Sequence, residues 1–378
     1  MSNVKKVSGM ILFFVILGIL VVSLLSYGQK EVIENDPSVL HITILDSEEY
    51  YYSDAGIDHG IKMALKKIEK ESAISVELEI VDDGGDYATG ISMAEELANN
   101  PKVDAVISFQ NFEAIGSEAE IFEKARKPFI VTMGCYDEVA ENEYDYFLAD
   151  FLSGQAIGAR IGEYLKEQGV KNIALCHSDT VFERDEVKGL QSVIKDVDGI
   201  SVRDTMTGPF HNEELASLLT RCEQLQIDAV VANFYNQEDS AWLISRLRTL
   251  RPDLVVAGDY ALDSTDILEA YGKELEGAVI VPVYPYVQSK KLEAFIEEYE
   301  AFSGERFSTA AVQYYDLFQM LAKCYEDTGN LDEMMQALKS EEGYHGIAGV
   351  IRFDMNGRLQ AEECPIFVCR NGEFIFEK

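Results

Sequence analysis

The stretch VELEIVDDGGDYATGISMAEELANN, residues 76–100, contains the pattern that predicts the fold of the whole chain. Its first part alternates apolar and charged residues as a strand does, and its second part repeats apolar residues at helical spacing. Asp82, Asp83 and Asp86 stand between the two parts with a pair of glycines. Metal-binding loops space their acids as in D-x-D-x-D-G, and this stretch does not. We therefore interpret it as a strand-to-helix turn in which Asp86 caps the helix, not as a metal or catalytic cluster.

The same alternation of strand and helix extends in both directions along the chain. Strand-like runs and helical stripes follow one another from residue 39 to 133, and the rhythm restarts with a long helical segment at 151–169. This order predicts an α/β protein with parallel sheets flanked by helices on both faces. A strand-like run at 278–287 then precedes three helical segments, and the chain closes with two hairpin-like units that turn at Asn356-Gly357 and Asn371-Gly372.

Length and charge narrow the classes of function. A chain of 378 residues suits two domains better than one. It carries 32 lysines and arginines against 67 aspartates and glutamates, a formal net charge of −35. A field of that sign repels phosphate backbones and argues against a nucleic-acid partner.

The N-terminus predicts export. Lys5 and Lys6 precede an uncharged apolar run at 10–27, which as a helix would be roughly 27 Å long, close to the hydrocarbon thickness of a bilayer. The basic flank should stay inside and the remainder should be extracytoplasmic. We expect residues 1–28 to be either an uncleaved membrane anchor or a signal peptide cleaved near Gly28, followed by a polar spacer at 29–38.

Neither the cysteines nor any motif points to an enzyme. The cysteines have wide, irregular spacings without a CxxC pair, which argues against zinc, and we expect mostly buried free thiols; they are Cys135, Cys176, Cys222, Cys324, Cys364 and Cys369. A catalytic pair of Cys135 with His177 is conceivable and disfavoured. The chain lacks G-x-S-x-G, H-E-x-x-H, G-x-x-x-x-G-K-[ST] and G-x-G-x-x-G. We therefore predict no catalytic residue, no metal and no cofactor.

Candidate ligand residues follow from the fold, because open α/β sheets bind ligands beyond the carboxyl ends of their strands. The residues that stand at these positions are mostly aromatic or polar: Tyr51, Tyr52, Ser53, Asn111, Phe112, Met133, Cys135, Phe182, Tyr235 and Asp259. Each has a simpler explanation as well. The tyrosines could cover a lobe edge, the phenylalanines could pack away from a ligand, and Asp259 could cap the following helix.

Several segments, taken in order, resemble one family of proteins. They are GIDHGIKMALKKIEKES (56–72), the opening stretch, DFLSGQAIGARIGEYLKEQGVKNIALCHSD (150–179), QYYDLFQMLAKCYEDTG (313–329) and HGIAGVIRFDMNGRL (345–359), the last with a G-x-x-G-x-x-x-F-D-x-N-G pattern. Residues 39–378 resemble the leucine/isoleucine/valine-binding proteins, the type 1 periplasmic solute-binding proteins of ABC transporters.

The resemblance implies two Rossmann-like lobes, joined by three crossovers, that close on a ligand between them. We expect the crossovers near residues 146–152, 279–286 and 346–352. One lobe would comprise 39–148 plus 283–345, and the other 149–282 plus 346–378. The resemblance further implies a small-molecule ligand, an ABC permease as partner and, through the N-terminal helix, contact with the membrane.

Amino-acid binders of that family hold the ligand carboxylate with a serine and a threonine and meet the ammonium with an acid. Matching the motif puts Phe112 at the serine position, Met133 and Cys135 at alanine and threonine positions, and Phe182 where a tyrosine is usual. Asp259 matches the acid. The resemblance thus implies a ligand other than a standard α-amino acid, one larger, flatter, more apolar or cationic. Two alternatives are a membrane-anchored sensor module that reports to a partner protein and an enzyme on the same fold.

Overall fold

Five parallel strands form the centre of the first half of the molecule, which we call the first lobe. The computed structural model describes residues 36–52, 54–109, 114–133, 137–361 and 364–377. The sheet has the order β2-β1-β3-β4-β5, and its strands are β1 (Val39–Asp46), β2 (Ser75–Asp82), β3 (Ala105–Ser108), β4 (Phe129–Val131) and β5 (Phe147–Ala149). The carboxyl ends of all five strands therefore lie along one edge.

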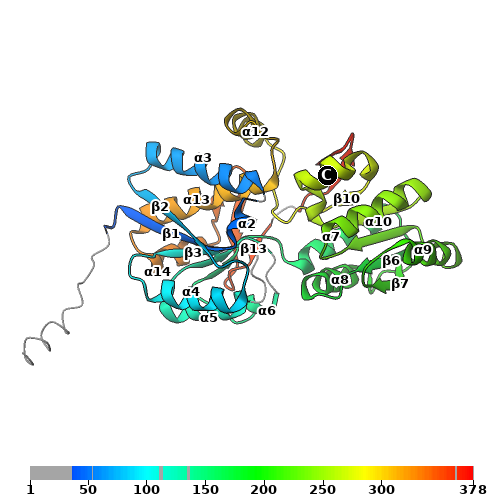
Figure 1. Cartoon of the computed structure of the whole chain (residues 1–378), viewed down its shortest axis with the longest axis horizontal. Helices are drawn as coiled ribbons and strands as arrows, with labels where there is room; N and C mark the ends of the chain where they lie inside the picture. Colours follow the sequence, from blue (N-terminus) through cyan, green and yellow to red (C-terminus); the bar gives the residue numbers. More distant parts are fainter. Residues whose placement is uncertain (1–35, 53, 110–113, 134–136, 362–363, 378) are drawn as a thin grey trace, which may run out of the picture. The chain divides into compact units, whose positions relative to one another are not determined.

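Helices cover both faces of this sheet (Figure 1), with α3 and α13 on one side and α4 and α5 on the other. The helices of the lobe are α2 (Glu48–Tyr51), α3 (Ala55–Glu71), α4 (Tyr87–Asn99), α5 (Ile115–Ala125), α6 (Asp137–Ala140), α12 (Lys290–Ser303), α13 (Thr309–Thr328) and α14 (Leu331–Leu338). In α3, Ile57, Ile61 and Ile68 fall on one stripe and are buried. Burying such a stripe against the sheet is what holds the layers together.

The stretch at 82–86 is the strand-to-helix turn that its sequence predicts. Gly84 and Gly85 adopt positive φ angles of 63° and 67°, which reverse the chain after β2. Asp86 Oδ1 then accepts a hydrogen bond from the Thr89 amide at 2.9 Å, as an N-cap does. The cap satisfies one of the free amides at the start of α4, and the interpretation of Asp86 is confirmed.

The second half, which we call the second lobe, is built on a seven-stranded sheet of order β15-β14-β10-β9-β8-β6-β7. Its strands are β6 (Asn172–His177), β7 (Ser201–Thr207), β8 (Ala229–Asn233), β9 (Val255–Gly258), β10 (Val279–Ile280), β14 (Phe367–Arg370) and β15 (Glu373–Phe376). Its helices are α7 (Gly154–Glu167), α8 (Val181–Ile194), α9 (Asn212–Gln224), α10 (Gln237–Leu250), η1 (Tyr260–Asp263), α11 (Thr265–Tyr271) and η2 (Gly272–Leu275). The strands β6 to β10 pair in parallel, whereas β14 pairs antiparallel to β10 and β15.

The two C-terminal hairpins form where the Asn-Gly turns predict them. β14 and β15 are joined by Asn371 and Gly372, both with positive φ, the conformation of a two-residue primed turn. The other hairpin belongs to a separate small sheet of β11 (Tyr344–His345), β12 (Val350–Phe353) and β13 (Leu359–Gln360). The predicted strand at 278–287 is much shorter than expected, since only Val279–Ile280 is extended in the sheet. Pro282 and Pro285 follow, and proline has no amide hydrogen to continue a ladder.

Three connections join the lobes. The first leaves β5 and enters α7, and the second runs from β10 to α12; they touch where the Leu152 amide donates to the Val283 carbonyl at 2.7 Å. Residues 346–352 were expected to form the third. However, the Ile347 and Ala348 amides donate to Asp316 of α13, so this segment is held against the first lobe. The third connection therefore lies between β13 and β14, downstream of the expected range.

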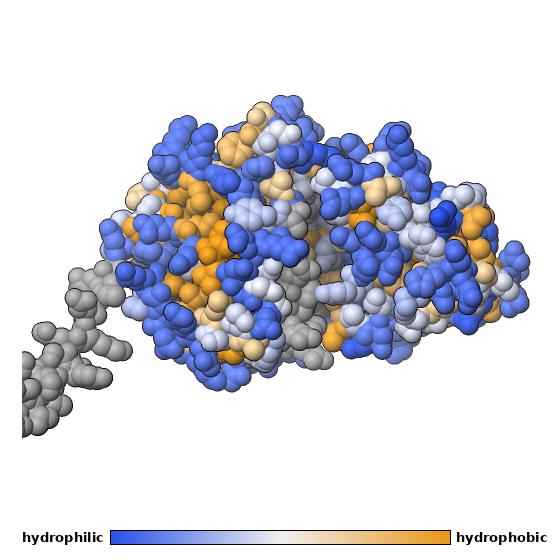
Figure 2. All heavy atoms as spheres, in the orientation of Figure 1, coloured by the Kyte–Doolittle hydropathy of each residue, from blue (hydrophilic) through white to orange (hydrophobic). Residues whose placement is uncertain are grey.

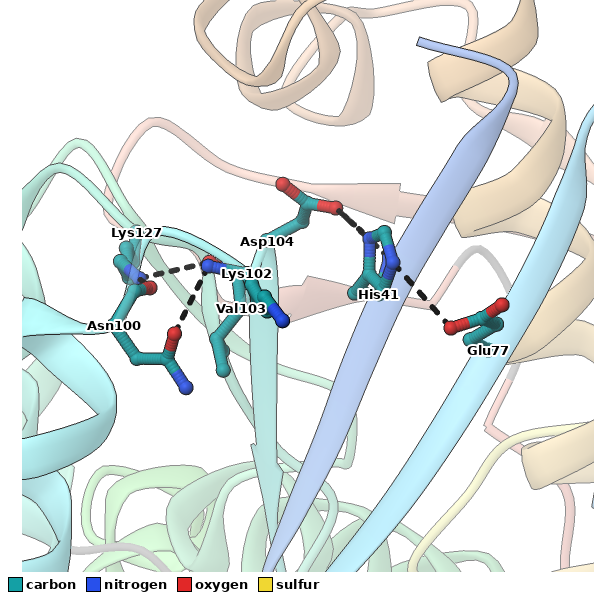
Figure 3. Close-up of polar contacts among 7 residues, drawn as sticks. All are labelled: His41, Glu77, Asn100, Lys102, Val103, Asp104 and Lys127. Atoms are coloured by element: carbon teal, nitrogen blue, oxygen red, sulfur yellow. Dashed lines mark hydrogen bonds and ion pairs between the residues drawn. The ribbon is translucent and has the colours of Figure 1, made fainter. Parts of the chain in front are cut away.

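The end of the first sheet opposite the carboxyl edge is fixed by polar side chains (Figure 3). The Lys127 ammonium donates to the backbone carbonyls of Leu97, Asn100 and Val103, at the C-terminal end of α4 and the loop that follows. The His41 ring lies 3.0 Å from Asp104 Oδ2, measured from Nδ1. These contacts anchor the loop before β3 at the amino ends of the strands.

Both halves have extensive apolar cores, and only a few large apolar side chains of the described residues are exposed. The face in Figure 2 is predominantly hydrophilic, with apolar side chains gathered on the first lobe. The five cysteines that the structure describes are free thiols, as expected, and three of them are buried: Cys176, Cys222 and Cys369. Cys135 and the apolar run at 10–27 lie outside the described residues. None of the helices in the described part of the chain combines the length and hydrophobicity that a bilayer span requires.

Candidate functional site

Buried acids gather at the carboxyl edge of the second sheet. Asp259 follows β9, and Glu183 and Glu186 belong to the first turns of α8, which begins just after β6. Their exposed fractions are only 6%, 3% and 1%. We call these three residues the acid cluster. Because parallel strands end at the same edge, strand ends and helix starts bring together side chains that are distant in sequence.

Several hydrogen-bond acceptors in and beside the acid cluster have no partner in the described part of the chain. The Asn233 side-chain amide at the end of β8 donates to Glu186 Oε2 at 2.6 Å. Asp259 Oδ1 accepts from the Ala261 amide at 2.7 Å, so Asp259 also caps η1. Among the described residues, Glu183 Oε2, Glu186 Oε1 and Asn233 Oδ1 are buried and find no hydrogen-bond partner. Buried polar atoms are seldom left unpaired, and a bound molecule is one reason for an exception.

Burial raises the pKa of every acid in the cluster, and repulsion by neighbouring carboxylates adds to it at Glu183 and Glu186. Burial, with a smaller contribution from Asp259, raises the pKa of Glu183 to about 7. Burial also raises the pKa of Asp259 to about 6, against the opposing hydrogen bond from Ala261. The pKa of Glu186 lies well above its usual range, because it is buried and faces both other carboxylates. In the described part of the chain, no lysine, arginine or histidine forms an ion pair with any of the three. Such perturbed acids are typical of functional sites.

Aromatic rings border the acids. Phe182 and Tyr260 meet edge to face, with ring centroids 6.1 Å apart. Burial raises the pKa of Tyr260, and the charges of Asp259, Tyr50, Glu186 and Glu183 raise it further, in that order. Tyr260 therefore lies close enough to the acid cluster, and to Tyr50 of α2 in the first lobe, for their charges to affect its pKa. An aromatic face next to carboxylates is suited to a cationic group.

A row of glycines positions the helix that carries the two glutamates. Gly154, Gly158 and Gly162 occur at four-residue spacing along one face of α7. A Cβ atom on Gly158 would lie 1.8 Å from the Glu186 carbonyl oxygen, and one on Gly189 of α8 would lie 2.0 Å from that of Gln155. The backbones of α7 and α8 are thus in direct contact, which fixes where the first turns of α8 point.

At the carboxyl edge of the first sheet several polar side chains are paired within the lobe, whereas the buried carboxylates of Glu118 and Asp150 find no hydrogen-bond partner among the described residues. Asp46 at the end of β1 accepts from the Phe109 amide at 2.6 Å and from the Ser47 amide at 2.7 Å. The Tyr50 hydroxyl donates to Met133 Sδ at 2.8 Å. Deeper in the lobe, Glu118 is completely buried, and burial with the charges of Asp83 and Asp46 raises its pKa to about 8.

The predicted site residues fall into different surroundings. Asp259 is buried in the acid cluster, and Phe182 is half-buried beside Tyr260. Met133 is half-buried and contacts Tyr50. Tyr51 is 2% exposed, and its hydroxyl donates to Asp58 at 3.1 Å, so it packs within the first lobe.

The remaining predicted residues are either exposed or outside the described part of the chain. Tyr52 is 58% exposed and Tyr235 is 66% exposed. The residues outside the described part are Ser53, Asn111, Phe112 and Cys135. The ligand-contact role of all these residues stays a prediction.

Glu183 and Glu186 were not predicted as site residues. Both lie in the segment VFERDEVKG (181–189), which reads as an ordinary helix start, because acids there complement the helix dipole. The one feature of the sequence that could have indicated them is their three-residue spacing, which puts both side chains on the same face of the helix. In the structure both are buried, whereas Arg184 between them is exposed.

Comparison with known families identifies the class of protein. The sequence profile described as Periplasmic binding protein matches residues 45–372. No curated protein matches the sequence.

Solved structures agree with the family in fold. An ABC transporter substrate-binding protein of Desulfitobacterium hafniense, in complex with Leu, has a TM-score of 0.77 at 16% identity; the match covers 89% of this chain and 99% of that one. A branched-chain amino acid transporter substrate binding protein of Streptococcus pneumoniae, with isoleucine, has a TM-score of 0.70 at 18% identity over 89% and 99% of the two chains. A solute binding protein of R. palustris, with benzoate, has a TM-score of 0.73 at 17% identity over 90% and 95%. At these identities the likeness establishes the fold alone, and the predicted fold class is confirmed.

Proposed function

The chain belongs to the Periplasmic binding protein family, and from this premise we propose that it captures a small-molecule solute outside the cytoplasm for an ABC permease. The observation that supports a binding role is the acid cluster at the carboxyl edge of the second sheet, where buried acceptor atoms find no partner among the residues that the structure describes. Similar folds in the comparison bind leucine, isoleucine and benzoate, so the fold accommodates chemically different solutes.

We further propose that the solute is not a standard α-amino acid. In the sequence, Phe112 and Cys135 stand at the positions of the serine and the threonine with which amino-acid binders of the resembling family hold the ligand carboxylate. A hydrogen bond missing from a buried charge costs about 1–3 kcal/mol, or roughly tenfold in affinity. Asp259 matches the acid with which those binders meet the ligand ammonium group. Glu183 and Glu186 add two further buried acids beside it.

The proposal is tested with the full-length chain, purified in a mild detergent because of the apolar run at 10–27. Thermal shift is measured against a panel of amino acids, aromatic acids, sugars and amines, and hits are followed by calorimetry. We expect at least one class to raise the melting temperature, because a ligand that binds only the folded state stabilises it. Mass spectrometry of the recovered ligand should find it unchanged. A chemically altered ligand would favour an enzyme, and the absence of any hit would overturn the binding role.

Extracytoplasmic placement is part of the same proposal. Residues 1–28 would either anchor the protein or be removed near Gly28, and the mass of the protein isolated from its native host distinguishes the two. Accessibility of the mature protein to protease added outside intact cells tests the placement itself. Protection of the whole chain from that protease would contradict export.

A further inference from the structure

We propose that the solute is an organic cation with at least two positive charges, a diamine or polyamine, whose ammonium groups bind Glu183, Glu186 and Asp259. This inference rests on the proposed function and specifies the ligand class of the same site. It differs from an amino-acid clamp, in which a single acid meets a single ammonium group.

The unused atoms in the cluster require a ligand that donates hydrogen bonds. Ionised carboxylate oxygens and an amide oxygen can only accept from a donor, and at this strand end the atoms Glu183 Oε2, Glu186 Oε1 and Asn233 Oδ1 find no partner among the described residues. The Asn233 oxygen is the independent indication, because this neutral side chain is 3% exposed and its nitrogen is already bound to Glu186. An ammonium group brings three donors and no acceptor, so it satisfies all these atoms without leaving a polar atom of its own unpaired.

The number of acids sets the charge of the ligand. Three carboxylates buried together repel one another, and one ammonium group can neutralise only one of them. No arginine or lysine of the described residues forms an ion pair with them, since Arg184 pairs with Asp179 and Lys188 with Asp185. The internal segments outside the described residues cannot supply the charge either, because QNFE (110–113), GCY (134–136), Ser53 and EE (362–363) contain no basic residue.

The rings beside the acids favour an organic cation over a metal ion. Phe182 and Tyr260 form an edge-to-face pair next to the cluster, and Tyr50 lies within electrostatic reach of Tyr260. Such rings bind the methylene chain of an amine and are attracted to its charged ends. A calcium or magnesium site would instead surround the ion with oxygen ligands and water.

The experiment is titration calorimetry of the full-length chain in detergent with 1,4-diaminobutane and spermidine. The comparison probes are 1-aminobutane and 1,4-butanediol, which match the shorter diamine in length but lack one or both charges. L-leucine, benzoate and Ca²⁺ complete the set. We expect both polyvalent amines to bind at least tenfold more tightly than 1-aminobutane, and the diol, L-leucine, benzoate and Ca²⁺ to bind weakly or not at all.

Isosteric variants locate the site. Glu183→Gln, Glu186→Gln and Asp259→Asn should each weaken diamine binding by about tenfold, since each removes one charge from the pair that forms with an ammonium group. Asp185→Asn is the matched control. Asp185 is equally buried on the same helix, but its side chain lies against Gly154 and pairs with Lys188, so this variant should change affinity less than about twofold.

The outcomes separate this inference from the proposed function. Equal affinity for 1-aminobutane and 1,4-diaminobutane, or tight binding of only a neutral or anionic solute, overturns the polyvalent cation and leaves solute binding intact. Binding of Ca²⁺ that the three variants abolish would replace the amine with a metal. A loss in Asp185→Asn equal to that in the other variants would contradict the placement of the site. Failure of every solute in the wider panel overturns the binding role itself.

Discussion

Asn233, the last residue of β8, donates a hydrogen bond from its side-chain Nδ2 to Glu186 Oε2 of α8 at 2.6 Å. The side-chain oxygen of Asn233, Oδ1, has no partner among the described residues. The bond joins a strand end to a helix that follows a different strand. It orients one carboxylate of the acid cluster and at the same time leaves a second acceptor beside it. The pair therefore leaves one acceptor atom available to a donor group, as the proposed ligand requires.

The stability of the ligand-free protein should fall as the pH rises from about 5 to about 7.5. Burial raises the pKa of Glu183 to about 7 and that of Asp259 to about 6, above their unfolded values of 4.5 and 3.8. The folded state then holds protons that the unfolded chain has lost, so the free energy of unfolding decreases through this window, by on the order of 2 kcal/mol. Glu186, whose pKa is also raised, adds to this fall in stability, and the positive charge of Arg184 opposes it at Glu183. Tyr260 does not contribute, because its hydroxyl stays protonated in both the folded and the unfolded state throughout this pH range.

Urea unfolding at constant ionic strength measures this dependence. Glu183→Gln provides the control, because a side chain without a proton to lose should show a flatter profile and be more stable than wild type by about 1–2 kcal/mol near pH 8. Diamine affinity should change in the opposite direction and increase with pH, as the acids ionise. A profile that rises from pH 5 to pH 7.5 in the wild type would contradict the assignment of buried, uncompensated acids.

Gly158→Ala should destabilise the second lobe. The new Cβ atom would meet the Glu186 carbonyl oxygen at 1.8 Å, and this oxygen is backbone that cannot move aside without shifting α8. We expect a loss of about 2–3 kcal/mol in the free energy of unfolding and a weaker ligand affinity, since Glu183 and Glu186 move with the helix. Gly116→Ala in α5 is the matched control, because its Cβ would approach only Val139 at 3.8 Å. That variant should be neutral or stabilising by up to about 1 kcal/mol.

Lys127→Met should lower stability without affecting ligand binding. The ammonium group donates to three backbone carbonyls, and burial lowers its pKa to about 8. Methionine keeps the apolar stem but leaves those carbonyls without their donor, which should cost about 1–3 kcal/mol in chemical denaturation. Lys124→Met serves as the control, since Lys124 forms an exposed pair with Glu120 and should contribute less than about 0.5 kcal/mol. Reduced ligand affinity in Lys127→Met would show that this end of the sheet is connected to the site.

Asp86→Ala separates the two interpretations of the acidic turn. Loss of the cap on α4 should cost about 1 kcal/mol of stability, and Asp86→Ser should recover most of it, because serine also accepts at an N-cap. Ligand affinity should be the same in all three proteins, measured by calorimetry. If alanine and serine reduced ligand or metal binding equally while stability stayed constant, the turn would have a functional role after all.

The fold could be predicted largely from the sequence, because each strand and helix carries its own periodic signal. The turn at Asp86 and the hairpin at Asn371 and Gly372 have local chemistry that admits few other conformations. The third connection was placed too early. Its true position depends on hydrogen bonds from Ile347 and Ala348 to Asp316, some thirty residues away, and no local pattern reports such contacts.

The site could be predicted only in part. Asp259 was proposed as a ligand acid or as a helix cap, and in the structure its carboxylate caps η1 while it lies in the acid cluster. Glu183 and Glu186 could not be distinguished in advance from ordinary acids at a helix start. Their difference is burial, which arises from the packing of α8 on α7 and from the strand ends beside them, and therefore only from tertiary structure.

The glycine row of α7 has a practical consequence for engineering. The contact of α8 with α7 is made by backbone atoms, at the Glu186 carbonyl and at Gly189, so the side chains at 183 and 186 can differ without altering the contact that seats the helix. Substitutions at positions 183 and 186 that keep Gly189 and the α7 glycines should change ligand selectivity without disturbing the packing of α8 on α7. A biosensor library for new amines, or for uncharged analogues, could thus be confined to a few codons.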